Sequence, residues 1–240
     1  MSREVEGPRH IVVTGASRGL GLGFARRWLE RGERVFALAR DPAAAPALGE
    51  LAGAHPESLR VQQCDVADDA SVETARRAVE AVWERVDILV NNAGICGARE
   101  DALGALDFGE LRRVFEVNAV GPLRVARAFL PLLGRGARPR VVHISSLMGS
   151  IDDNGSGGAY AYRMSKAALN MASRNLGHEL RRSGILSVAL HPGWVRTDMG
   201  GPGGRLSVEE AVASLASTID RLGPEHNGGF YDLEGQPAPW

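Results

Sequence analysis

The sequence predicts an α/β protein with one doubly wound, parallel sheet of about seven strands and helices on both faces. Short apolar runs alternate with longer helix-like runs, and this order implies successive strand–helix–strand units. A glycine-rich turn joins the first apolar run to the first helix-like run. The 240 residues suit one large α/β unit, and neither an internal repeat nor a convincing linker divides them. We therefore expect residues 1–240 to form one domain.

The predicted strands are short apolar runs. In chain order they cover residues 10–15, 34–39, 59–65, 87–94, 140–146, 185–193 and, as a short seventh, 228–235. Their regular alternation with helix-like runs is what indicates parallel rather than antiparallel pairing.

The predicted helices are longer runs, several of them amphipathic. They cover residues 20–32, 68–86, 115–133, about 160–182 and 206–223. Gly32 is expected to end the first helix, and Asp69 or Ser71 to cap the second. The stretch 41–58, rich in alanine and proline, is short enough to be one crossover connection.

Composition argues against several classes of protein. A formal net charge of −1 disfavours nucleic acid or an anionic membrane as the main partner. The chain has no apolar run of the ~20 residues that a membrane span needs, and its N-terminus lacks the apolar stretch of a secretory signal. Cys64 and Cys96 have no metal-ligand spacing and suggest no disulfide framework. We expect a cytoplasmic protein without a metal.

The turn after the first strand has the residues that a phosphate-binding loop needs. Glycines there allow a tight turn, close approach of the backbone to a pyrophosphate, and close packing of the helix whose N-terminus faces the phosphates. A glycine-rich turn alone is weak evidence, but one that follows the first strand and opens a helix favours a dinucleotide. The predicted loop contacts are Gly15, Ser17, Arg18, Gly19, Leu20 and Gly21.

The end of the second strand bears on the choice of cofactor. An acidic residue there would bind the adenosine ribose hydroxyls, but this strand ends in Arg40, 19 residues after Gly21. An arginine at that place accommodates a 2′-phosphate, and Arg18 in the glycine loop adds a second charge. The alternative is that both are solvated surface arginines, and Asp41 directly after Arg40 complicates the choice. The pattern favours NADP(H) over NAD(H).

The chain contains one lysine, Lys166, and its position suggests acid–base chemistry. Composition bias towards arginine would explain its rarity alone. Tyr162, however, lies four residues upstream, and residues i and i+4 share one face of a helix. A tyrosine is a poor acid–base catalyst at its usual pKa of ~10, and a nearby ammonium lowers that pKa. Arginine is not the same compact point charge, and Tyr160 has Met164 at the equivalent position.

Five motifs occur in the order and rough spacing of one known family. They are TGASRGLG (14–21), NNAG (91–94), SS (145–146), YRMSK (162–166) and PGWVRT (192–197). Together they make the chain resemble the short-chain dehydrogenase/reductase family over nearly its whole length. Residues 149–170 and the ending EGQPAPW look more particularly like its sniffer and C-factor-like carbonyl reductases. The resemblance implies a Rossmann-type fold, with a dinucleotide-binding half at about 8–145 and a catalytic half at about 146–240.

The resemblance implies the catalytic set Asn118, Ser146, Tyr162 and Lys166. Tyr162 would be the general acid, and Lys166 would also hydrogen-bond the nicotinamide ribose. Ser146 would hold the substrate oxygen, because two residues and a glycine follow it as in the family pattern. Whether the neighbouring Ser145 shares that role is open. The spacing of 16 from Ser146 to Tyr162 exceeds the commonest family spacing, and we expect the extra residues, 152–158, to form a loop beside the pocket.

Asn118 lies in the predicted helix 115–133, which contains Pro122. Proline lacks the N–H that would bond the carbonyl four residues back, and that carbonyl belongs to Asn118. We expect the carbonyl to hold a water that extends a proton relay from Lys166, as described for the family. The alternative is that Gly121 and Pro122 merely separate two helices and Asn118 caps the break.

The resemblance also implies contacts to the rest of the cofactor and to the substrate. The further cofactor contacts are Asp65, Val66, Asn91, Ala93, Gly94, Pro192, Gly193, Val195 and Thr197, and the substrate pocket would include Ser146, Met148, Tyr162 and Trp194. Only a short stretch rich in glycine and proline precedes the predicted helix 206–223, so we expect an open, tolerant pocket. Family habit favours a homodimer or homotetramer.

The expected function is NADPH-dependent reduction of a small-molecule aldehyde, ketone or quinone. Two alternatives stay open: an NAD-linked alcohol dehydrogenase of the same family, and a dinucleotide-binding regulatory protein of C-factor type without physiological turnover. The presence of all four catalytic residues counts against the second. His191 could suggest a hydrolase, but a histidine at the end of a strand more often serves packing.

Overall fold

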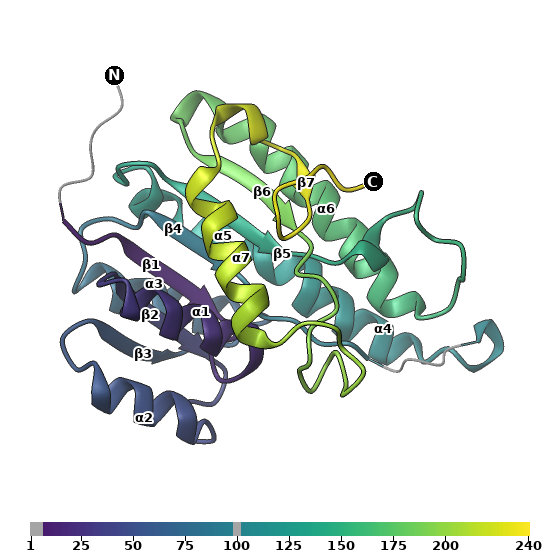
Figure 1. The fold of residues 1–240 in the computed structure, drawn as a ribbon, viewed down its shortest axis with the longest axis horizontal. Coiled ribbons are helices and arrows are strands. Elements are labelled where there is room, and N and C mark those ends of the chain that lie inside the picture. Colours follow the sequence, from purple (N-terminus) through teal and green to yellow (C-terminus); the bar gives the residue numbers. More distant parts are fainter. Residues whose placement is uncertain (1–6, 98–101) are drawn as a thin grey trace.

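A computed structural model describes residues 7–97 and 102–240. Its centre is a seven-stranded parallel sheet in the order β3-β2-β1-β4-β5-β6-β7 (Figure 1). The strands are β1 (His10–Thr14), β2 (Arg34–Ala39), β3 (Leu59–Gln63), β4 (Ile88–Asn91), β5 (Arg140–Ile144), β6 (Leu186–Leu190) and β7 (Phe230–Tyr231). All seven predicted strands are present. The strand order reverses between β1 and β4, which is where a doubly wound sheet opens a crevice for a ligand.

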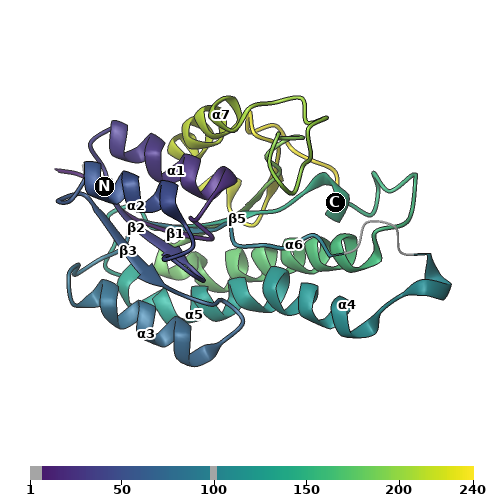
Figure 2. The same ribbon diagram turned by 90° about the horizontal axis from the view of Figure 1, so that it is seen from below.

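Helices cover both faces of the sheet (Figure 2). They are α1 (Gly19–Glu30), α2 (Pro46–Ala54), α3 (Asp69–Glu80), α4 (Phe108–Phe115), α5 (Gly121–Leu133), α6 (Tyr160–Leu180) and α7 (Val208–Arg221). One apolar core joins the sheet to α1, α2 and α7, and a second joins it to α3, α5 and the end of α6. This is the Rossmann-type architecture that the sequence predicts.

The central strands are mostly apolar because both faces of the sheet are covered. The edge strand β3 differs, since it carries Arg60, Gln62 and Gln63 and is only partly buried. In β1, Ile11 and Val13 belong to the core beside α1, whereas Val12 between them belongs to the core beside α3. Each is fully buried. Alternate side chains of one strand thus hold the two helical layers to a single sheet.

The prediction for α3 is wrong at both ends. Asp68 caps the helix by accepting a hydrogen bond from the Ala70 N–H at 3.1 Å, so neither Asp69 nor Ser71 is the cap. Ser71 instead accepts a hydrogen bond from the Asp65 N–H at 2.9 Å. The helix ends at Glu80 rather than near residue 86, and Trp83 turns inward to stack on His10 at 4.7 Å between ring centroids.

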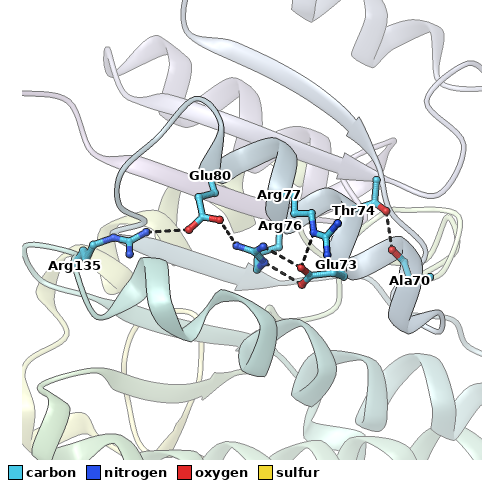
Figure 3. A network of polar contacts seen from close by, with 7 residues as sticks. All are labelled: Ala70, Glu73, Thr74, Arg76, Arg77, Glu80 and Arg135. Carbon is cyan, nitrogen blue, oxygen red and sulfur yellow. Dashed lines mark hydrogen bonds and ion pairs between the residues drawn. The ribbon is translucent and has the colours of Figure 1, made fainter.

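The outer face of α3 carries a network of ion pairs (Figure 3). Arg76 reaches Glu73 at 2.9 Å and Glu80 at 2.5 Å, one helical turn away in each direction. Hydrogen bonds from Arg76 and then Arg77 lower the pKa of Glu73 to about 2. Arg135 extends the network towards the end of α5. Exposed pairs of this kind contribute little to stability, so we interpret this face as a solvated surface.

Loops at the carboxyl ends of six strands meet at one edge of the sheet. The glycine loop follows β1, Arg40 follows β2 and Asp65 lies just beyond β3. Asn92, Ser145 and His191 come directly after β4, β5 and β6. This is the edge at which open α/β sheets bind their ligands. Within residues 7–97 and 102–240, no helix has the length and apolar content to cross a membrane.

We expect His143 in β5 to make stability depend on pH. Its Nδ1 lies 3.3 Å from the Asn91 amide nitrogen and its Nε2 lies 3.3 Å from the Ser187 hydroxyl. Complete burial, with the Lys166 charge second, lowers the pKa of His143 to about 3. The unfolded chain binds a proton near pH 6.5 and the folded chain does not, so stability falls as pH falls from 6.5 towards 3. The loss should be about 2 kcal/mol between pH 7 and pH 5.

Urea unfolding at pH 7 and pH 5 measures this loss. The variant His143→Asn should lose less stability over that interval than the wild type does. His178→Asn, at an exposed position of α6, is the matched control and should keep the wild-type dependence. Equal losses in all three proteins would contradict the assignment to His143.

Candidate active site

A cavity of about 480 Å³ lies at the carboxyl edge of the sheet. This volume suits a small-molecule or cofactor site. Its wall is built from the glycine loop, the ends of strands β2 to β6, and α6. Fourteen residues that the sequence predicts for the site line it: Gly15, Ser17, Arg18, Gly19, Leu20, Arg40, Asp65, Val66, Ala93, Gly94, Tyr162, Lys166, Pro192 and Thr197.

The glycine loop needs glycines because neighbouring backbone comes too close to leave room for a Cβ. Gly15 has a φ of +65°, and an added Cβ there would lie 2.7 Å from the Ala93 Cα. An added Cβ on Gly21 would collide with the Gly15 carbonyl oxygen. Gly21 therefore lets α1 begin tightly against the loop and does not itself line the cavity. Asn92 braces the loop by donating to the carbonyl oxygens of Thr14 at 2.9 Å and Gly15 at 3.1 Å.

The beginning of α1 suits an anionic group. The N-cap residue Arg18 makes no side-chain capping bond, and the first turn carries no acidic residue. The first N–H groups of a helix without a cap still need acceptors, and the helix dipole favours a negative charge there. Thr197 approaches from the opposite side, because an added Cβ on Gly19 would lie 3.4 Å from its methyl group. The loop thus fits a pyrophosphate.

Arginine side chains mark the end of the cavity beyond β2. Arg40 and Arg18 both line it and both are exposed. The Arg18 guanidinium forms an ion pair with Asp198 at 3.0 Å across the rim. Asp41 points into a local turn, where its carboxylate accepts from the Ala44 N–H at 3.2 Å. Of these two neighbours, only Arg40 faces the cavity.

The side chain of Lys166 is buried at the other end of the cavity, one helical turn after Tyr162. Its ammonium lies 5.7 Å from the centroid of the Tyr162 ring and donates to the Ile144 carbonyl oxygen at 2.8 Å. Only 4% of Lys166 is exposed, and burial lowers its pKa to about 8. A charge in so dry a place acts strongly on its neighbours. Tyr162 and Lys166 thus lie together at this end of the cavity.

The turn after β5 presents Ser146. Residues Leu147–Gly149 form a 3-10 turn that Ser146 caps, and its hydroxyl accepts from the Met148 N–H at 3.1 Å. Such a hydroxyl still has its own hydrogen to donate. The turn lies directly on α6, because a Cβ on Gly149 would come within 2.7 Å of the Lys166 backbone. His191 holds the turn by accepting from the Leu147 N–H at 3.1 Å.

Ser145 and Ser146 differ in their partners. Ser145 is buried and donates its hydroxyl hydrogen to the Asn170 side-chain oxygen at 2.5 Å. It contributes to the cavity wall, whereas Ser146 does not. Because the Ser145 hydroxyl already donates its hydrogen to Asn170, Ser145 is a poorer hydrogen-bond donor to a substrate than Ser146.

Asn118 lies in a π-helical turn, Glu116–Val120, between α4 and α5. The three segments run on without a break, as predicted for this helix. The Asn118 side chain bonds the Ile95 N–H and carbonyl oxygen, both at 2.8 Å. It also donates to the Ser165 hydroxyl at 3.0 Å, and Ser165 donates to the Tyr162 carbonyl oxygen at 2.8 Å. Asn118 thus connects the loop after β4 to the helical turn that carries Tyr162.

Several predicted site residues lie outside the cavity wall: Gly21, Asn91, Asn118, Ser146, Met148, Gly193, Trp194 and Val195. Asn91 is buried and donates to the Pro122 carbonyl oxygen at 3.2 Å, so its amide joins β4 to α5. Trp194 is 52% exposed, and its indole N–H donates to the Gly200 carbonyl oxygen at 2.8 Å. Val195 is buried and pairs with Leu206.

The sequence analysis missed part of the wall. Residues that it did not select are Cys64, Asn92, Ile95, Val117, Ile144, Ser145, Arg196, Asp198, Met199 and Val208. Burial, with Asp65 and Asp68 next, raises the pKa of Cys64 to about 12, so this thiol stays protonated. Asn92 could have been found, because it belongs to the NNAG motif. The stretch from Thr197 to Ser207 contains no helix, as expected for an abbreviated cover.

Comparison with known proteins gives one consistent result. A family model described as short chain dehydrogenase matches residues 9–204. The C-signal protein of Myxococcus xanthus is 53% identical over 155 residues, which cover 65% of this chain and 93% of that protein. The NADPH-bound carbonyl reductase from chicken fatty liver has a TM-score of 0.91 and 36% identity, covering 98% of this chain and 100% of the other. The carbonyl reductase Sniffer of D. melanogaster has a TM-score of 0.92 and 33% identity with the same coverage.

Proposed function

This chain belongs to the short-chain dehydrogenase family, a family of oxidoreductases, and from that premise we propose that it is an NADPH-dependent carbonyl reductase. One observation carries the proposal: a single cavity joins the glycine loop and Arg40 at one end to Tyr162 and Lys166 at the other. A bound dinucleotide would extend from one end of this cavity to the other. The chicken reductase and Sniffer are both carbonyl reductases, and this similarity supports reduction as the direction of the reaction.

The mechanism assigns a separate task to each residue of the chain. When bound, NADPH supplies the hydride for the carbonyl carbon. The Ser146 hydroxyl donates a hydrogen bond to the carbonyl oxygen and so stabilises the charge that develops there. Tyr162 gives its phenolic proton to the resulting alkoxide. The protonated Lys166 stabilises the phenolate that remains, because it is close, buried and positive.

Proton return to Tyr162 would pass through the π-helical turn. Pro122 has no N–H to offer the Asn118 carbonyl in an α-helical turn. We infer that this carbonyl holds a water between Lys166 and solvent, as the sequence predicts. The side chain of Asn118 is already engaged with Ile95 and Ser165, so it positions the turn and the backbone carries the relay.

Turnover with a mixed panel tests the proposed reaction. Loss of nicotinamide absorbance is followed with NADPH and with NADH against aldehydes, ketones and quinones. We expect turnover that is faster with NADPH. Tight NADPH binding without turnover on any member of the panel would contradict the proposal.

The choice of cofactor can be tested by reversing charge at Arg40. We expect Arg40→Glu to lower kcat/KM with NADPH by on the order of 10- to 100-fold, because one charge-assisted contact to the 2′-phosphate is lost. Use of NADH should rise, and adding Arg18→Glu should raise it further. Arg34→Glu, at the opposite end of β2, is the matched control and should change neither value. An unchanged NADPH-to-NADH ratio in Arg40→Glu would contradict the assignment.

A regulatory role is the second candidate. The 53% identity to the C-signal protein covers 155 residues and is the observation that favours it. A protein of this type would bind dinucleotide without physiological turnover. The complete set of Asn118, Ser146, Tyr162 and Lys166 favours the enzyme, since binding alone requires no acid beside the cavity.

A further inference from the structure

The loop of residues 150–158 connects the Ser146 turn to α6, and burial cannot hold it in place. Every residue from 151 to 158 is exposed. Its one large apolar side chain, Ile151, is 78% exposed. The rest of the loop is aspartate, asparagine, serine and glycine. Its shape therefore depends on polar contacts, both within the loop, as from the Gly157 N–H to the Asn154 side-chain oxygen at 3.0 Å, and from other elements.

The backbone of Trp240 holds the first part of this loop. Its carbonyl oxygen accepts from the N–H groups of Ile151 at 2.8 Å and Asp152 at 2.9 Å, and from the Ser150 hydroxyl at 3.0 Å. The indole ring of Trp240 in turn lies 5.0 Å from the Arg174 guanidinium of α6. Residues 150–152 are thereby tied to α6.

Arg163 holds the second part. Its guanidinium donates to the Ser156 hydroxyl at 2.9 Å and to the Gly157 carbonyl oxygen at 3.2 Å. A third bond, at 3.4 Å, reaches the Met148 carbonyl oxygen in the turn that presents Ser146. One planar fork thus ties the loop and the Ser146 turn to the helix residue that follows Tyr162. Lysine could not reproduce this set, because its ammonium is a single point.

The backbone between these anchors is strained. Ala159, just before α6, has a φ of +47°, which is unfavourable for a residue with a Cβ. Such a conformation persists only where the surroundings hold it. The backbone N–H of Arg163 donates to the Ala159 carbonyl oxygen at 2.9 Å, which is the ordinary first-turn bond of α6 and does not depend on the side chain.

Arg163 connects to the proposed chemistry through Met148. The Met148 N–H donates to the Ser146 hydroxyl at 3.1 Å, while the carbonyl oxygen of Met148 accepts from Arg163. The Ser146 hydroxyl is thus contacted by the N–H of Met148, the residue whose carbonyl oxygen Arg163 holds. Arg163 directly follows Tyr162 in the chain. Arg163 can therefore set the position of Ser146, the hydrogen-bond donor, relative to Tyr162, the proposed acid.

We propose that Arg163 is a positioning residue that fixes the Ser146 hydroxyl relative to Tyr162 and holds residues 150–158 as a rim of the carbonyl-binding pocket. This inference rests on the proposed function. It assigns to Arg163 an effect on the carbonyl substrate and none on the dinucleotide, because its side-chain contacts all lie in residues 148–157.

A double-mutant cycle with Ser146 tests the proposal. Arg163→Ala should lower kcat/KM for the carbonyl by about 10- to 100-fold, the scale of a small misplacement in an active site. The Kd for NADPH should stay within about twofold, and Arg163→Lys should restore part of the loss. Arg182→Ala, an exposed arginine beyond the end of the same helix, is the matched control. In the Ser146→Ala background, Arg163→Ala should cost less than about threefold, because coupled residues are not additive. Multiplicative losses would overturn the proposal.

Hydrogen exchange separates this inference from the proposed reaction. Amides of residues 148–157 should exchange faster in Arg163→Ala than in the wild type, while those of β1 and α1 should be unchanged. Faster exchange in a protein that reduces no carbonyl would reject the proposed function and keep Arg163 as the anchor of the loop. Unchanged exchange would overturn the role of Arg163 whatever the activity.

Discussion

Replacing Tyr162 by phenylalanine should lower kcat by about 10²- to 10⁴-fold, the usual contribution of a positioned general acid. The change removes the phenolic proton and leaves the ring, which is almost fully buried beside Lys166. We therefore expect the variant to fold and to bind NADPH about as tightly as the wild type. Initial rates over the carbonyl panel and a binding titration with NADPH measure the two properties separately.

Tyr160→Phe is the matched control for this prediction. Tyr160 begins the same helix, but the residue four positions later is Met164 rather than a lysine. The control should keep at least most of the wild-type rate. A Tyr162→Phe variant that retained wild-type turnover would show that another group protonates the alkoxide, and the mechanism would then be wrong.

The fold was predictable because its signals are local. Most strands are compact apolar runs, and the alternation of β1 side chains between two cores explains why a central strand needs no polar face. Helix α2 was not predicted, because its stretch is rich in alanine and proline. Leu48 and Leu51 nevertheless bury its inner face, and Pro46 occupies the first turn. The end of α3 depends on Trp83 packing against His10, which is distant in sequence.

The predicted part of the site consists of residues that follow a strand or share a helical turn. Gly15, Arg40 and Asp65 could be selected because strand ends in a parallel sheet converge at one edge. Asp198 and Met199 could not, since they reach the cavity through a segment that folds back over it. The Lys166 ammonium donates to the Ile144 carbonyl oxygen, which is a backbone atom. A backbone acceptor cannot be predicted from the type of residue that carries it.

The support of Ser146 illustrates the same limit. The pattern of a serine, two residues and a glycine selected the residue, and the contact of Gly149 with Lys166 gives that pattern a physical reason. His191 was considered as a hydrolase residue and set aside; it instead accepts a hydrogen bond from Leu147 beside Ser146. Burial lowers the pKa of His191, so the neutral ring needed for this acceptance is favoured. None of this is visible before the strands are placed.

Replacing Lys166 by arginine should lower kcat/KM by on the order of 10²- to 10³-fold, the scale of losing one preorganised charged donor. The site is nearly closed around a slim ammonium, which donates to the Ile144 carbonyl oxygen and lies over the Tyr162 ring. A guanidinium is wider, planar and fixed in its donor directions. A guanidinium at position 166 would therefore keep the positive charge but not place it where the ammonium lies. Steady-state rates with NADPH, beside a Kd for NADPH, test this expectation.

Lys166→Met is the companion variant, because it keeps the length of the side chain and removes the charge. Burial lowers the pKa of Lys166 to about 8, so the folded protein below that pH carries a charge that burial disfavours. The buried charge lowers the free energy of unfolding. This destabilisation is fully present below pH 8 and disappears as pH rises towards 10.5, where the unfolded chain also loses the proton. The stability of Lys166→Met relative to wild type, measured by urea unfolding, should therefore be greatest near pH 7 and decline towards pH 10, while its turnover should be lost. Turnover that survived Lys166→Arg would instead make the lone lysine an accident of an arginine-rich composition.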